Sequence, residues 1–179
     1  MGEPRTLAEK IRYLVGRLDA ADIPYLIGGA LALAYHVAEP RATQDIDIQV
    51  YPPADLDHLL AALPDDVAVS ETDRRGLERD LQIRLWWDRT PLDLFLPADP
   101  FHEVMRQRAD RVPFPGLTNP LSIVSATDLT VLKALFDRPK DWVDIADMVA
   151  FGSVDVADAA RWLREFGQDD RARRLLALP

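Results

Sequence analysis

Two aspartates, placed two residues apart, are the side chains of this sequence best suited to chemistry. Asp45 and Asp47 lie in Asp45-Ile46-Asp47-Ile48-Gln49-Val50, where polar and apolar residues alternate. A period of two is typical of a half-buried strand, so both carboxylates share one face, roughly 7 Å apart along the backbone. They can converge on ions about 4 Å apart, the separation found in two-metal phosphoryl-transfer sites. Taken alone, such a pair is more typical of solvated residues on the exposed face of an edge strand.

A glycine pair upstream favours the chemical interpretation. Tyr25–Ile27 is a short apolar run that ends in Gly28 and Gly29, and residues 30–37 have helix-forming composition. Glycines between a strand and a helix let backbone N–H groups approach phosphate. Glycines, a helix, a turn and an Asp-x-Asp strand, in this order, suit a nucleoside triphosphate bound with metal.

A third carboxylate follows on a predicted hairpin. The runs 82–87 and 91–96 are apolar or alternating, and Asp88-Arg89-Thr90 separates them. Asp93 is the polar outlier of the second run. Burying an unpaired charge is costly, so Asp93 is expected to have a partner or a metal, unless it faces solvent at a sheet edge.

The order of these motifs resembles the nucleotidyltransferase superfamily, which shares a glycine turn, an Asp-x-Asp strand and a carboxylate on a neighbouring strand. The segments 28–34 and 41–48 are most similar to the AbiEii and MenT branch, the toxins of bacterial toxin–antitoxin systems. The segment 128–148 is similar to the helical Lys motif and the acidic motif of that branch. The resemblance spans roughly residues 23 to 150.

The resemblance implies an NTP site. Gly28 and Gly29 would cradle the triphosphate, Arg41 and Thr43 would line its phosphate end, and Lys133 would contact it. Thr43 stands where some antibiotic nucleotidyltransferases have His, so the sequence does not match their Arg-x-His-x-Asp-x-Asp motif.

The resemblance also implies a two-ion Mg²⁺ site. Asp45 and Asp47 would hold the metal, and Asp93 would complete the site and assist deprotonation of the acceptor hydroxyl. Asp144 would orient Lys133 or the acceptor.

Patterns within the predicted helices leave simpler roles open for the last two residues. Lys133 lies at the margin of an apolar stripe and could be a surface partner of Asp137 at i+4. Likewise, Asp141, Asp144 and Asp147 could form the solvated face of one helix.

Composition limits the class of protein. The chain has 179 residues, no cysteine and a formal net charge of −9. It therefore has no disulfide framework or thiolate zinc site, and it shows no signal core or membrane span, so a cytoplasmic protein is expected. The acidity argues against general nucleic-acid binding.

An RNA partner would have to bind through local arginines. Two arginine clusters are candidates, although either could be an ordinary solvated face. The first contains Arg161, Arg164, Arg171, Arg173 and Arg174, and the second contains Arg74, Arg75 and Arg79.

The remaining elements must position these residues. A capping box of Thr6 and Glu9 predicts a helix over 7–20. We also expect helices over 54–63 and 101–108, a strand over 67–69, a loop-rich strand crossing over 112–120, and helices from Ser125 with breaks at Pro139, Gly152-Ser153 and Gly167. The fold class is α+β: a nucleotidyltransferase-like mixed-sheet lobe over 1–120, then a helical C-terminal lobe over 121–179, with the triphosphate between them.

The expected function is Mg²⁺-dependent transfer of NMP from an NTP to an acceptor. Within the resembling branch the acceptor is the tRNA 3′ end, and the protein acts as a toxin with a cognate antitoxin protein. The alternatives are transfer to a small molecule of the aminoglycoside or lincosamide type, transfer to a protein hydroxyl, and a non-catalytic nucleotide-binding module.

Overall fold

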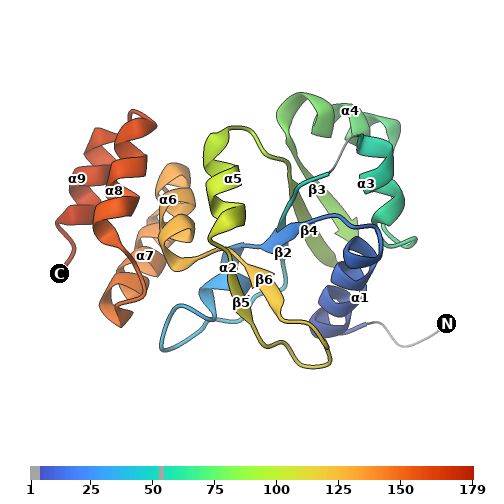
Figure 1. Ribbon diagram of the computed structural model, residues 1–179, viewed down its shortest axis with the longest axis horizontal. Coiled ribbons are helices and arrows are strands. Elements are labelled where there is room, and N and C mark those ends of the chain that lie inside the picture. The colour runs from blue at the N-terminus through green and yellow to red at the C-terminus, as the bar shows by residue number, and fades with distance from the viewer. Residues whose placement is uncertain (1–4, 53–54) are drawn as a thin grey trace.

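A mixed β-sheet forms the centre of the protein in a computed structural model that describes residues 5–52 and 55–179 (Figure 1). Within these residues the strand order is β3-β4-β2-β1-β6-β5. β2 runs parallel to β4 and antiparallel to β1, β1 runs parallel to β6, and the β3–β4 and β5–β6 pairs are antiparallel. The strands are β1 (Tyr25–Ile27), β2 (Ile46–Val50), β3 (Gln82–Trp87), β4 (Thr90–Phe95), β5 (Asp110–Val112) and β6 (Leu121–Ile123).

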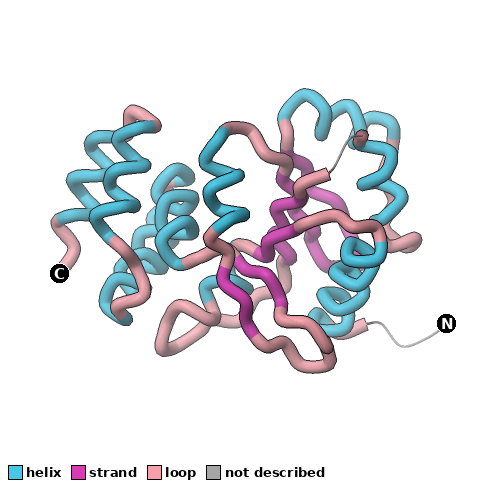
Figure 2. Tube along the Cα trace, in the orientation of Figure 1, coloured by secondary structure: helices cyan, strands magenta, loops and turns pink. Residues whose placement is uncertain are grey.

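Helices flank the sheet on both sides (Figure 2). The helices α1, α3 and α4 lie on one side, and the consecutive helices α5 to α9 extend from the other side toward the C-terminus (Figure 1). They are α1 (Leu7–Ala20), α2 (Gly29–Leu33), α3 (Leu56–Ala62), α4 (Glu71–Asp80), α5 (Pro100–Gln107), α6 (Ala126–Phe136), α7 (Pro139–Phe151), α8 (Val156–Glu165) and α9 (Asp169–Leu176). None of the helices in these ranges is long and apolar enough to cross a membrane.

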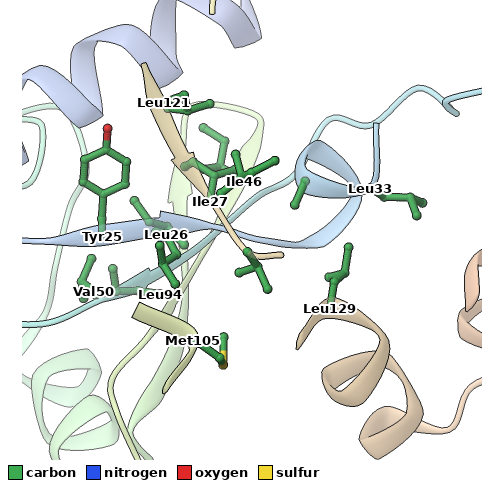
Figure 3. Close-up of a cluster of buried hydrophobic side chains, with 14 of the residues drawn as sticks. Tyr25, Leu26, Ile27, Leu33, Ile46, Val50, Leu94, Met105, Leu121 and Leu129 are labelled. Atoms are coloured by element: carbon green, nitrogen blue, oxygen red, sulfur yellow. The ribbon is translucent and has the colours of Figure 1, made fainter. Parts of the chain in front are cut away.

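The alternation in β2 divides the sheet into a core face and a polar face. Ile46, Ile48 and Val50 are completely buried, whereas Asp47 between them is partly exposed. Figure 3 shows the buried side chains of the central strands packed together, with Met105 of α5 and Leu129 of α6 in the same cluster. This apolar packing fixes the register of β2, because a slip of one residue would bury its carboxylate face.

Local capping and turn patterns of the sequence are confirmed. α1 has the predicted bounds, and its Thr6–Glu9 capping box is formed. The hairpin β3–β4 turns at Asp88, whose φ is +53°. Pro139 opens α7, and Gly152, at φ +80°, ends it.

Two expectations differ from the structure, and one helix was not predicted. Residues 67–69 form no strand, because Val67 is instead buried in the core after a turn in which its N–H donates to the carbonyl of Pro64. α4 is a helix that the sequence pattern did not predict, since Leu77 is its only buried residue and an apolar stripe is lacking. α2 ends at Leu33, four residues before the predicted end.

The mixed sheet with its helices confirms the predicted α+β class. The division into lobes at residue 120 stays a prediction, and β6, which follows directly, is a strand of the sheet between β1 and β5. The predicted helix over 54–63 corresponds to α3, which Asp55 caps, while its expected start at Ala54 lies outside the described residues.

Candidate active site

Two of the predicted metal ligands lie side by side on the sheet. In the parallel pair of β2 and β4, Asp47 is opposite Asp93, and Gln49 is opposite Phe95. Opposed residues of neighbouring strands point to the same face. Asp45 directly precedes β2, and its backbone N–H donates to Oγ1 of Thr43 at 3.2 Å. The inner strands β2 and β4 therefore gather the three predicted carboxylates on the polar face.

The glycine turn lies against Asp47. The N–H of Gly28 donates to the carbonyl oxygen of Asp47 at 2.8 Å, so this amide is used within the protein. Gly29 has φ +53°, and a Cβ built on it would lie 1.9 Å from Oδ2 of Asp47. Gly29 must therefore be glycine for two reasons, its left-handed backbone and the closeness of the carboxylate.

Asp47 has a strongly perturbed pKa. Burial raises its pKa to about 6, and the nearby charges of Asp93 and Asp45 act in the same direction, while Lys133 and Arg84 lower it. Three carboxylates so close together favour protonation of one of them or the binding of a cation.

Lys133 is buried in an ion-pair network and is not a surface partner of Asp137. Its side chain is only 7% exposed, and Nζ lies 2.6 Å from Oδ2 of Asp144. Arg41 donates to both oxygens of Asp144, at 3.3 and 3.1 Å. Burial alone would raise the pKa of Asp144, but its bonds to Arg41 and Lys133 outweigh burial and lower it.

The solvated-face alternative for the acidic residues of α7 is wrong for two of the three. Asp141 is completely buried, Asp144 is nearly so, and Asp147 is exposed. Asp141 accepts hydrogen bonds from Arg138 at 2.6 and 3.0 Å and lies 3.8 Å from Nζ of Lys133. Lys133 thus lies between two carboxylates of α7.

The partner of Asp93 was missed by the sequence reasoning. Arg84 is opposite Asp93 in the β3–β4 hairpin and donates to both of its carboxylate oxygens, at 2.7 and 2.6 Å. The predicted turn of three residues, 88–90, would pair position 84 with 94, whereas the observed two-residue turn pairs Arg84 with Asp93. The pair explains how the Asp93 charge is accommodated without a metal.

The described residues form no ready-made cluster of three or more carboxylate or imidazole groups in metal-binding arrangement. The donor chemistry nevertheless fits Mg²⁺, which prefers carboxylate oxygens. The absence of a Cβ at Gly29 allows the carboxylate of Asp47 to lie directly against the glycine turn. Arg84 is the cation that a metal at Asp93 would have to share or displace.

A cavity of about 300 Å³ opens beside these groups. The glycine turn, Asp47 and Lys133 line part of it. Its walls continue between the strands and the helices α5 and α6, where apolar side chains predominate: Leu81, Phe95, Leu96, Met105, Leu129 and Leu132. A charged group and an apolar group of one ligand can therefore both be accommodated.

The arginine clusters are largely paired with acidic residues. Arg171 donates to the carbonyl of Leu135 at 3.1 Å and lies 3.5 Å from Asp137, and Arg173 pairs with Asp170. Further pairs join Arg161 to Asp158 and Glu165, Arg174 to Asp137, Arg74 to Asp57 and Glu78, Arg75 to Glu71, and Arg79 to Asp80. Only Arg164 in these clusters has no ion-pair partner among residues 5–52 and 55–179.

Comparisons with known proteins identify the fold. No protein-family model matches the chain, and no curated protein matches it in sequence. The solution structure of the antibiotic-resistance factor ANT(2″)-Ia is similar with a TM-score of 0.55 and 14% identity, over 95% of this chain and 91% of that one. A nucleotidyltransferase-like antigenic protein from Paracoccidioides brasiliensis is similar with a TM-score of 0.47 and 19% identity, over 79% of this chain and 74% of that one. The mixed sheet and its helices thus share the fold of ANT(2″)-Ia.

Proposed function

We propose that the protein transfers a nucleoside monophosphate from an NTP to a hydroxyl of an acceptor. One observation carries the proposal: Asp47 and Asp93 are opposed on parallel strands, beside the Gly28-Gly29 turn and the cavity that Lys133 lines. Fold similarity alone does not establish an activity, so the argument depends on these side chains.

Each group has a task in this reaction. The acceptor oxygen forms a bond to the α-phosphorus while the bond from phosphorus to the bridging oxygen of pyrophosphate breaks. Asp93 accepts the proton of the acceptor hydroxyl, and Lys133 neutralises charge on the leaving pyrophosphate. Asp144 is a positioning residue that holds Lys133 through a 2.6 Å contact.

Asp45, Asp47 and Asp93 would hold Mg²⁺, which, when bound, supplies positive charge at the phosphates. Gly29 lets the carboxylate of Asp47 take its place against the glycine turn. The raised pKa of Asp47 supports this role, because a bound cation would relieve the repulsion among the three carboxylates.

Two classes of acceptor are candidates for this reaction. The tRNA 3′ end, and with it the toxin role and an antitoxin partner, is supported by the motif wording of residues 28–34, 41–48 and 128–148. A small cationic molecule of the aminoglycoside type is supported by the net charge of −9 and by the largely paired arginines, and it agrees with the fold shared with an antibiotic-resistance factor.

Incubation with each α-labelled NTP and Mg²⁺ tests the proposal. Total tRNA is supplied in one arm and a panel of aminoglycosides and lincosamides in the other. We expect label on one acceptor class with release of pyrophosphate. Asp47→Asn and Asp93→Asn should reduce transfer by at least about 100-fold, and Asp147→Asn, on the exposed side of α7, should not.

Each other outcome has a distinct meaning. Label on the protein itself indicates a protein hydroxyl as acceptor. NTP binding without transfer to any acceptor, in the presence of Mg²⁺, would identify a non-catalytic nucleotide-binding module. Full transfer by Asp47→Asn would refute the assignment of the site.

A further inference from the structure

Gln49 is a buried residue whose side-chain amide nitrogen has no hydrogen-bond partner in the described part of the chain. The residue is 7% exposed, and its Nε2 is a buried nitrogen without a hydrogen bond. Within residues 5–52 and 55–179, neither atom of the amide is hydrogen-bonded to protein. Buried polar groups are normally paired, because an unpaired one loses its bonds to water and gains nothing.

The position of Gln49 indicates which kind of ligand could supply the missing hydrogen bonds. Gln49 follows Asp47 by two residues on β2, points to the same face, and lines the same cavity. It is opposite Phe95 of β4, whose side chain also lines the cavity. A planar donor and acceptor therefore lie next to an aromatic ring, two residue pairs along β2 and β4 from Asp47 and Asp93.

Helix α6 adds a second aromatic ring to the lining of the cavity. Phe136, the last residue of α6, lines the cavity with a 54% exposed side chain, and the guanidinium of Arg138 lies 4.9 Å from its ring centroid. Exposed aromatic and guanidinium planes are surfaces on which bases stack.

We infer that this cavity binds a nucleobase, whose hydrogen-bonding edge is read by the amide of Gln49 between the rings of Phe95 and Phe136. Glutamine amides pair with adjacent donor and acceptor atoms on base edges. A sugar hydroxyl would satisfy the amide but not the apolar walls. The inference rests on the proposed function, which places the triphosphate beside Lys133 in the same cavity. The base comes either from the donor NTP or from the last nucleotide of an RNA acceptor.

The test replaces Gln49 by leucine, which keeps the volume but removes the amide. Binding of the four NTPs, of inorganic tripolyphosphate, of nucleosides and of total tRNA is measured by calorimetry with Mg²⁺, without a second substrate. We expect about tenfold weaker binding of the preferred NTP or of tRNA, with tripolyphosphate unchanged. The melting temperature of the free protein should not fall, because the lost amide had no partner. Gln107→Leu, on the exposed side of α5 and outside the cavity, is the matched control.

Loss of NTP affinity identifies the donor base as the occupant, and loss of tRNA affinity alone identifies the acceptor base. Unchanged affinity for every probe, equal weakening of tripolyphosphate, or a wild type that binds none of the base-containing probes would overturn the inference. Gln49→Met serves if the leucine variant does not fold. Gln49-dependent nucleoside binding without any transfer would support the inference and contradict the proposed function. Transfer whose rate and substrate affinity are the same in Gln49→Leu as in the wild type would support the proposed function and contradict the inference.

Discussion

At the scale of single residues, the carboxylate of Asp47 is destabilising when it is ionised. Its pKa is about 6 in the folded protein, whereas an aspartate in an unfolded chain has a pKa of about 3.9. Between these values the folded state binds more protons than the unfolded state. The free energy of unfolding therefore falls as pH rises from about 4 to 6 and loses no more above that range.

Asp47→Asn should remove this pH dependence. Without divalent cations, the variant should become more stable than the wild type as pH rises to 6, by on the order of 2 kcal/mol, and the difference should stay constant at higher pH. Urea unfolding between pH 4 and 8 measures it. Added Mg²⁺ should raise the melting temperature of the wild type only. A constant difference at every pH would contradict the raised pKa.

Gly29 and Gly16 should respond to alanine with opposite signs. Gly29→Ala places a Cβ 1.9 Å from Oδ2 of Asp47 on a backbone with φ +53°, so it should cost more than about 2 kcal/mol and displace the carboxylate. Gly16 is an exposed residue within α1 with no atom within 4 Å of its added Cβ. Gly16→Ala should stabilise the protein by about 0.5–1 kcal/mol. Urea unfolding of both variants compares them, and equal effects would contradict the close approach at Gly29.

At the scale of elements, the contact between α6 and α7 contains a buried charge network. Nζ of Lys133 lies 2.6 Å from Asp144 and 3.8 Å from Asp141, and both α7 residues are buried. Removing one partner of a buried ion pair leaves the other charge without compensation.

Asp144→Ala should therefore destabilise the protein by roughly 3 kcal/mol, the lower end of the range for buried pairs, because Asp141 still faces Lys133. Asp147→Ala changes an exposed residue one turn further along α7 and should stay within about 0.5 kcal/mol of the wild type. Chemical denaturation compares the two variants. The double variant Lys133→Met, Asp144→Leu should recover part of the stability lost in Asp144→Ala, because it removes the uncompensated charge. A double variant less stable than Asp144→Ala would show that the unpaired charge of Lys133 is not the cause of the loss.

At the scale of the whole molecule, the C-terminal arginines attach α9 to the helices before it. The guanidinium of Arg174 lies 3.9 Å from the ring centroid of Trp142 in α7, and Arg171 donates to the carbonyl of Leu135 in α6. The pair of Arg173 and Asp170 lies within α9 and is strongly exposed.

Replacing Arg171 and Arg174 with alanine should lower the melting temperature by several degrees, whereas Arg173→Ala should leave it unchanged. If tRNA is the acceptor, Arg173→Ala should also leave the salt dependence of its binding unchanged, because the charge of Arg173 is already paired. Thermal unfolding and a binding series in salt measure both effects. A weaker dependence of tRNA binding on salt concentration for Arg173→Ala would instead indicate that Arg173 contacts the RNA.

The local features of the site follow from the sequence itself. Alternation in residues 45–50 predicted that the carboxylate of Asp47 lies opposite the core, and glycine composition predicted the turn at Gly28 and Gly29. Capping at Thr6 and the break at Pro139 were predicted equally well. These features depend on backbone preferences within a few residues, and such preferences can be predicted from the local sequence.

Only the tertiary structure decided which charges meet. Arg41 and Asp144 are 103 residues apart in sequence, and the unpaired amide of Gln49 becomes apparent only when α5 and α6 enclose it. α4 escaped prediction because a helix that buries one leucine has no periodic apolar signal. Long-range contacts arise from how whole elements pack, and many pairings are compatible with the same local pattern until burial selects one of them.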